Sequence, residues 1–291
     1  MFKKVLIATD LSPASDALIE QLEGLRAYGA TECLLVQFLN MQTSVSMALT
    51  YSSETMESSL QSQEEVLRNQ GFTVESKTVA GLPKKEICNL ASEEGCSVIV
   101  VGARKESLVR EQFFGGLGPD LIHHCRTPIL LIRLEEKTRD GEVCVEPLAC
   151  NVSNHIVFPT DFSENAEHAF EVLQNMVADG ARTITLVHVV DKNTIRPEVE
   201  DRVEEFKQQA AERLEQMKAD LASHDHVAVE IQVSVGVPSA EILRLVRELP
   251  AQLVVMGSQG RSFVQELFLG SVSHNVARHA ESSVLLIPMD K

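Results

Sequence analysis

The sequence predicts an α/β protein built from two copies of a doubly wound domain with a parallel sheet. One observation is an internal repeat, in which Asp10 of the first half corresponds to Asp161 of the second, and Gly102 corresponds to Gly257. The other is that short β-branched runs alternate with longer amphipathic stretches in each half. Continuous apolar strands between helices indicate a parallel sheet that is covered on both faces.

The second half shows the alternation most clearly. Ser163 is a plausible helix N-cap, and Pro197 and Pro238 suit a first helical turn. Strands are expected at 155–158, 183–190, 227–235, 253–257 and 283–288, and helices at roughly 163–179, 197–223, 238–249 and 271–280. An open sheet of this kind binds ligands outside the carboxyl ends of its strands, where Asp161, His188 and Gly257 fall.

The domain boundaries follow from the repeat. We predict one domain at 1–134, a linker at 135–153 and a second domain at 154–291. The linker assignment rests on its charge, on Gly141 and Pro147, and on its lack of long periodicity.

Charge and composition exclude several classes of partner. The chain has 291 residues, a formal net charge of −16, and an ordinary balance of 44% hydrophobic and 23% charged residues. A strongly negative field repels nucleic acids and anionic membranes, so we expect neither as a partner. The N-terminal apolar run stops at Asp10 and resembles no signal peptide, and no run reaches the 18 or so apolar residues of a membrane span. A cytoplasmic protein is predicted.

The cysteines predict a reducing compartment. All six lie in the first half or the linker, and a disulfide-stapled protein would not usually leave one of two similar domains bare. We therefore expect reduced thiols. The alternative is a redox pair between Cys144 and Cys150.

One segment of the second half carries a phosphate-binding pattern. Gly257, Gly260 and Gly270 are followed by Ser271 and Ser273, in the spacing G-x2-G-x9-G-S. Glycine permits positive φ and lets the backbone approach a ligand closely, and a helix N-terminus with free amides binds anions. The alternative is that each glycine only makes a tight turn, but their combination with a strand-end aspartate favours a binding site.

On these residues the chain resembles a tandem universal stress protein, over both halves. The family's ATP-binding members carry the same glycine pattern and an aspartate after the first strand. The resemblance implies two Rossmann-like domains with five parallel strands each. It implies that ATP, ADP or AMP binds, with Mg²⁺ or Mn²⁺ as a possible companion, and that the last strands of the two halves pair, with a homodimer as a further option. The implied adenosine-end residues are Pro159, Thr160, Asp161 and Val189; those on the ribose and phosphate side are Met256, Gly257 and Gly260; those around the phosphates are Gly270, Ser271, Val272 and Ser273.

The first half departs from this pattern. If Gly260 is needed for positive φ, its replacement costs about 1–2 kcal/mol, and lost hydroxyl bonds to a phosphate cost about 1.5–3 kcal/mol more. We therefore predict one strong site per chain, in the second half, with the first weaker by about two orders of magnitude. The departures are Lys105 for the second glycine, Gly116 and Gly118 for the two serines, the nearby Pro119, Ala8 for Pro159, and Phe38 for Val189.

Three functions remain open from the sequence. The first is a nucleotide-binding stress-response or regulatory protein without obligatory chemistry, the second a slow ATP hydrolase or nucleotidyl transferase, and the third a nucleotide-free scaffold. The Walker-type and dinucleotide glycine loops are both absent, and no catalytic residue is assigned. No protein metal site is predicted, because the adjacent His123, His124 and Cys125 point about 100° apart on a helix.

Overall fold

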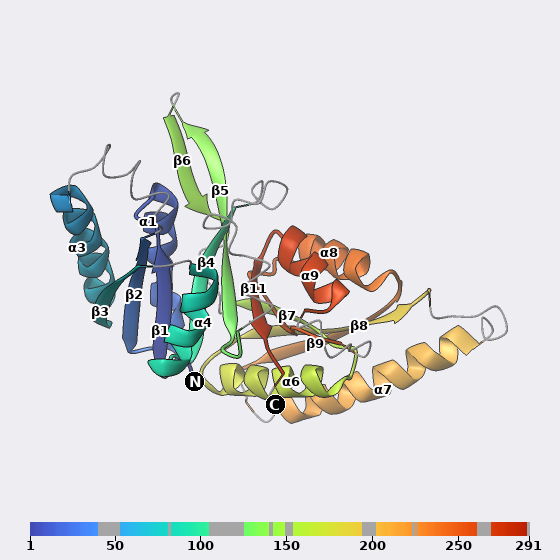
Figure 1. Cartoon of the computed structure of the whole chain (residues 1–291). Helices are drawn as coiled ribbons and strands as arrows, with labels where there is room; N and C mark the ends of the chain where they lie inside the picture. The colour runs from blue at the N-terminus through green and yellow to red at the C-terminus, as the bar shows by residue number, and fades with distance from the viewer. Residues whose placement is uncertain are drawn as a thin grey trace. The chain divides into compact units, whose positions relative to one another are not determined.

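The computed structural model divides into two compact units, 1–150 and 151–291 (Figure 1). The structure describes residues 1–39, 53–80, 83–104, 125–139, 142–148, 154–193, 202–222, 224, 226–260 and 269–289. Several residues of the sequence analysis lie outside this part of the chain: Lys105, Gly116, Gly118, Pro119, His123, His124, Gly141, Cys150 and Pro197.

The first unit contains a parallel sheet in the order β3-β2-β1-β4-β5. Its strands are β1 (Lys4–Thr9), β2 (Glu32–Leu39), β3 (Thr73–Ala80), β4 (Val98–Arg104) and β5 (Ile129–Arg139). The helices around it are α1 (Pro13–Ile19), the 3-10 helix η1 (Leu22–Tyr28), α3 (Ser53–Asn69) and α4 (Pro83–Glu93). The apolar residues of β1, β2 and β4 are almost all buried, as expected for strands covered on both faces.

The second unit repeats this arrangement, with its parallel sheet in the order β11-β10-β7-β8-β9. Its strands are β7 (His155–Pro159), β8 (Thr183–Asp191), β9 (Ala228–Gly236), β10 (Leu253–Gly257) and β11 (Ser283–Ile287). Every residue of β7, β10 and β11 is buried. The predicted fold class, a five-stranded parallel α/β sheet in each half, is confirmed.

Helices cover both faces of the second sheet. Figure 1 shows α6 (Glu164–Ala178) and α7 (Val203–Leu221) on one face, and α8 (Pro238–Glu248) and α9 (Ser271–His279) on the other. The Ser163 hydroxyl accepts a hydrogen bond from the Ala166 amide at 3.3 Å, so Ser163 is the N-cap of α6. Pro238 stands in the first turn of α8. The local signals of the sequence and the observed helix starts therefore agree.

The segment predicted as a linker contains regular structure. β5 extends to Arg139, and β6 (Glu142–Pro147) pairs with it in an antiparallel hairpin, which is the long two-stranded element of Figure 1. Lys137 bridges to Glu146 on the opposite strand at 3.2 Å. The alternation of polar and apolar residues along each strand is too short to be recognised in the sequence. The pairing of the two strands stabilises the hairpin, and this pairing leaves no periodic pattern in the sequence.

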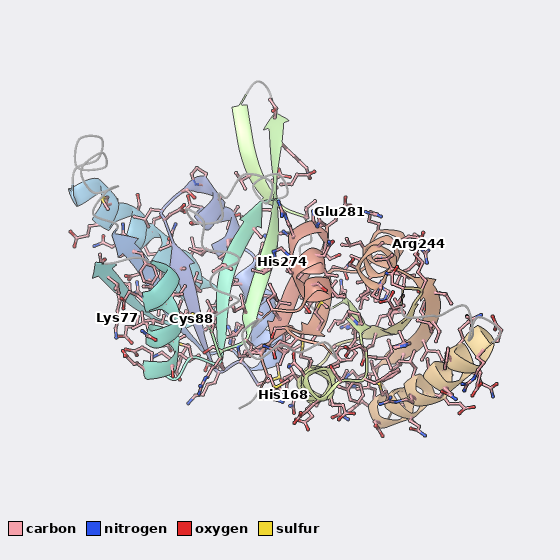
Figure 2. All side chains as sticks on the ribbon, turned by 45° about the vertical axis from the view of Figure 1, so that its right-hand side comes forward. Lys77, Cys88, His168, Arg244, His274 and Glu281 are labelled. Carbon is pink, nitrogen blue, oxygen red and sulfur yellow. A yellow bond between two sulfur atoms is a disulfide. The ribbon has the colours of Figure 1, made fainter. Side chains whose placement is uncertain are left out.

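The prediction of reduced thiols was wrong for two cysteines. Cys88, which lies on α4 (Figure 2), is disulfide-bonded to Cys125, just before β5, with the two Cα atoms 5.0 Å apart. The two residues are 37 positions apart, so only the fold brings them together. Cys33 and Cys96 are free and buried. Burial raises the pKa of the Cys33 thiol to about 12, and it also raises the pKa of Cys96.

Candidate functional site

The ends of β7, β8 and β10 surround a cavity of about 660 Å³ in the second unit. The strand order reverses between β7 and β10, which is the point where open α/β sheets usually bind ligands. All of the predicted binding residues line this cavity: Pro159, Thr160, Asp161, Val189, Met256, Gly257, Gly260, Gly270, Ser271, Val272 and Ser273. The fold therefore gathers residues that are more than a hundred positions apart.

The turn after β7 holds Asp161 in place. The Ser163 amide donates to Asp161 Oδ1 at 3.0 Å, and the Phe162 amide donates to Thr160 Oγ1, also at 3.0 Å. Phe162 has a φ of +58°, a left-handed conformation that is costly for a side chain with a Cβ. The side chains of Thr160 and Asp161 thus satisfy the amides of a strained turn and fix the direction of the carboxylate.

The motif glycines are needed for space and not for positive φ. Neither Gly257 nor Gly260 lies in the left-handed region, which corrects our reason for expecting a glycine at the second position. A Cβ on Gly260 would lie 2.6 Å from Asp161 Oδ2, and a Cβ on Gly257 would lie 2.7 Å from Asn165 Oδ1. Gly260 therefore allows the strand-end aspartate to approach the loop after β10, and Gly257 makes room for the Asn165 side chain.

The first turn of α9 faces the same cavity. Gly270 is its N-cap, and the Gly270 amide donates to Ser258 O at 2.7 Å, which ties the helix start to the loop after β10. The amides of Ser271, Val272 and Ser273 have no acceptor within the helix, because they belong to its first turn. Together with the helix dipole they form a positive end suited to an anion.

The two serines differ in their environment. Ser273 is buried, and its hydroxyl donates to Gly257 O at 2.8 Å. Ser271 is exposed at the start of the helix. The Ser273 hydroxyl thus holds the loop to the helix, while its amide and the Ser271 hydroxyl are the groups that a ligand can reach.

Sequence reasoning placed His188 at this edge of the sheet but missed Phe162 and Arg213, which pack beside it at the cavity wall. The ring of Phe162 stacks on His188 with centroids 4.6 Å apart, and the guanidinium carbon of Arg213 lies 3.9 Å from the Phe162 ring centroid. His188 Nδ1 lies 2.8 Å from Thr160 O. Arg213 comes from α7, together with Phe206 and Gln209. No motif marks the three α7 residues, because on a charged helix they look like solvated residues.

At the corresponding end of β1 in the first unit, described side chains form hydrogen bonds with one another. Thr9 Oγ1 donates to Gln63 Oε1 at 2.8 Å, and Gln63 Nε2 donates to Asp16 Oδ1 at 2.6 Å. The Ser15 hydroxyl donates to Asp10 Oδ1 at 2.6 Å. Gln63 is 3% exposed, and its bond to Thr9 at the end of β1 is buried.

In the part of the chain that the structure describes, no group of three or more histidine, cysteine, aspartate or glutamate side chains could hold a metal ion. Among the same residues, no helix is both long enough and apolar enough to span a bilayer.

Comparison with known proteins decides the family. The sequence model described as "Universal stress protein family" matches residues 1–133 and again residues 153–288. The chain belongs to the universal stress protein family. It carries two domains of that family in tandem.

Individual relatives match one domain at a time. Universal stress protein MJ0577 of Methanocaldococcus jannaschii is 29% identical over 151 residues, which cover 45% of this chain and 93% of the relative. Universal stress protein MJ0531 of the same organism is 29% identical over 153 residues, covering 48% and 85%. The family thus spans both halves, while these two relatives each align to about half of the chain.

Solved structures match the whole chain. A universal stress protein from Archaeoglobus fulgidus has a TM-score of 0.66 at 21% identity and covers 98% of this chain and 96% of its own. The protein PA1789 from Pseudomonas aeruginosa has a TM-score of 0.63 at 16% identity, covering 98% and 92%. At these identities the likeness shows that the tandem fold is shared.

Proposed function

We propose that the second unit binds an adenine nucleotide, ATP or its products ADP and AMP, and that the protein uses this binding in a stress response. The observation that carries the proposal is that Asp161, the glycine pair and the first turn of α9 line a single cavity. A volume of about 660 Å³ lies within the usual range of small-molecule sites. The family accounts for the stress-response role.

Each end of the proposed site has its own chemistry. An ionised carboxylate only accepts hydrogen bonds, so Asp161 suits the amino group of adenine or a ribose hydroxyl. The amides of Ser271, Val272 and Ser273 only donate, so they suit phosphate oxygens. These local donors act at short range, which lets an anion bind although the chain carries a net charge of −16.

The proposal includes one strong site per chain. In the second unit, Ala166 stands at the cavity wall, whereas Ser15 of the first unit bonds to the corresponding aspartate, Asp10. Gln63 bonds to Thr9 at the end of β1 in the first unit, whereas Thr160, the counterpart of Thr9, lines the cavity in the second. A nucleotide would have to displace buried hydrogen bonds in the first unit.

Calorimetry with matched aspartate variants tests this proposal. Titration of ATP into the full chain should give one strong site per chain. Asp161→Ala should weaken ATP binding about tenfold or more, because it removes a charged acceptor from the site. Asp10→Ala, the same change at the corresponding position of the first unit, should leave the affinity unchanged. Two equal sites, no binding by the wild type, or equal effects of the two substitutions would contradict the proposal.

A further inference from the structure

We infer that Asn165 is a positioning residue for the phosphate end of the nucleotide site. This inference rests on the proposed function of the second unit and adds a residue that lies outside the glycine motif. Asn165 stands in the first turn of α6 and is 1% exposed. A buried side-chain amide needs partners for both its oxygen and its nitrogen, so its contacts indicate its role.

The Asn165 side chain extends the hydrogen bonding between β10 and β11 past the end of both strands. The Ser258 amide donates to Ile287 O at 2.8 Å. Asn165 Nδ2 donates to the same carbonyl at 3.2 Å, and Asn165 Oδ1 accepts from the Gln259 amide at 2.8 Å. The side-chain amide thus links the end of β11 to the loop after β10, and fixes this loop as far as Gln259.

This loop in turn positions the start of α9. Ser258 O accepts from the Gly270 amide, and Gly270 is the N-cap of α9. The Ser273 hydroxyl adds a second tie, to Gly257 O. A chain of hydrogen bonds therefore runs from Asn165 through residues 257–259 to the helix turn that offers its amides to phosphate.

The absence of a side chain at Gly257 leaves room for the Asn165 side chain. A Cβ at Gly257 would lie 2.7 Å from Asn165 Oδ1 and 2.9 Å from Asn165 Cγ, closer than real Cβ atoms approach other atoms. The glycine at this motif position thus makes room for the asparagine that holds the loop.

The first unit lacks this device. In the alignment of KKVLIATDLSPASDALIEQL with NHIVFPTDFSENAEHAFEVL, Asn165 corresponds to Ala14. A Cβ on Gly102, the counterpart of Gly257, would meet the side-chain carbons Leu134 Cδ1 at 3.0 Å and Leu18 Cδ1 at 3.2 Å. The positioning asparagine is therefore a further difference between the two units, beside the altered glycines and serines.

The role predicts a split between ligands. Asn165 holds the loop that positions the first turn of α9, which faces phosphates. The turn that carries Asp161 is held by separate bonds, from the Phe162 amide to Thr160 Oγ1 and from the Ser163 amide to Asp161 Oδ1. Asn165→Ala should therefore weaken ATP binding about tenfold while changing adenosine binding less than about twofold, each measured by calorimetry on the full chain. A merely structural role would weaken both ligands alike.

The same helix offers a matched control. Asn175 of α6 is exposed and its Nδ2 donates to Glu171 O at 3.0 Å, so Asn175→Ala removes an equal amide away from the cavity. It should leave both affinities unchanged. Asn165→Ser keeps a small polar group that is too short to reach Gln259. It should also weaken ATP binding more than adenosine binding, and it replaces the alanine variant if that variant does not fold.

The outcomes separate this inference from the proposed function. If wild type binds ATP but Asn165→Ala binds it equally well, or loses ATP and adenosine in equal measure, the positioning role is wrong and the proposed function stands. If wild type does not bind ATP, the proposed function fails. If neither Asn165 variant folds, the residue belongs to the core and the positioning role is overturned.

Discussion

Replacing Gly257 by alanine should weaken ATP binding through a steric conflict that the structure locates. The added Cβ would lie 2.7 Å from Asn165 Oδ1 and 3.1 Å from Asn165 O. To relieve the contact, the Asn165 side chain has to withdraw or the loop has to move, and either change breaks the bond to the Gln259 amide. Leaving a buried amide without its partner costs about 1–3 kcal/mol.

The expected loss of affinity follows from this cost. In the free variant the loop can relax away from Asn165, but a nucleotide requires it in the native position. If restoring that position costs about 2 kcal/mol, ATP affinity falls about 30-fold. Titration calorimetry measures this change, and thermal unfolding of the same variant reports the accompanying loss of stability.

The first unit provides the control. Gly102→Ala places a Cβ against the ends of the Leu134 and Leu18 side chains, at 3.0 and 3.2 Å, which can turn aside. It should leave ATP affinity unchanged. In an Asn165→Ala background, Gly257→Ala should cost less than in the wild type, because Oδ1 and Cγ are gone. Equal ATP affinities for Gly257→Ala and wild type, or additive effects in the double variant, would refute the reasoning.

Two further predictions concern protonation and the thiols. Burial lowers the pKa of His155 from 6.5, so the neutral side chain contributes stability above about pH 6.5, and this stability is lost as the pH falls toward the lowered pKa. The variant His155→Gln should therefore show a smaller decline of Tm between pH 7.5 and 5.5 than the wild type. An unchanged decline would contradict this prediction. In native protein at pH 8, a thiol reagent should label Cys33 and Cys96 only slowly, because both thiols are buried. Mass spectrometry should find Cys88 and Cys125 labelled only after reduction of their disulfide. Labelling of Cys88 or Cys125 without a reductant would count against the disulfide.

Repetition and periodicity explain how much of the fold could be predicted. The strands β7, β10 and β11 of the second unit are short, largely apolar runs, and Ser163 and Pro238 mark helix starts by local chemistry, so these elements follow from a few neighbouring residues. The hairpin of β5 and β6 and the bond between Cys88 and Cys125 depend on pairing between segments. Such pairing leaves no periodic signal in either segment alone.

The candidate site divides in the same way. The glycines and the strand-end aspartate form a spaced pattern, so the sequence predicts that Asp161 and Gly260 belong to one site. The structure gives the reason for the glycine: a Cβ on Gly260 would lie 2.6 Å from Asp161 Oδ2. Asn165 and Arg213 could not be found this way. Each is a single polar residue on an amphipathic helix, and only the fold turns it toward the cavity or the loop.

The nucleotide content of the purified protein tests the central claim most directly. The protein is denatured and the released small molecules are identified and counted by mass spectrometry, for the wild type after saturation with ATP and removal of free ligand, and for Asp161→Ala treated in the same way. We predict close to one adenine nucleotide per wild-type chain and far less from the variant. No nucleotide from the wild type, or equal amounts from both proteins, would contradict a site formed by the strand-end aspartate and the first turn of α9.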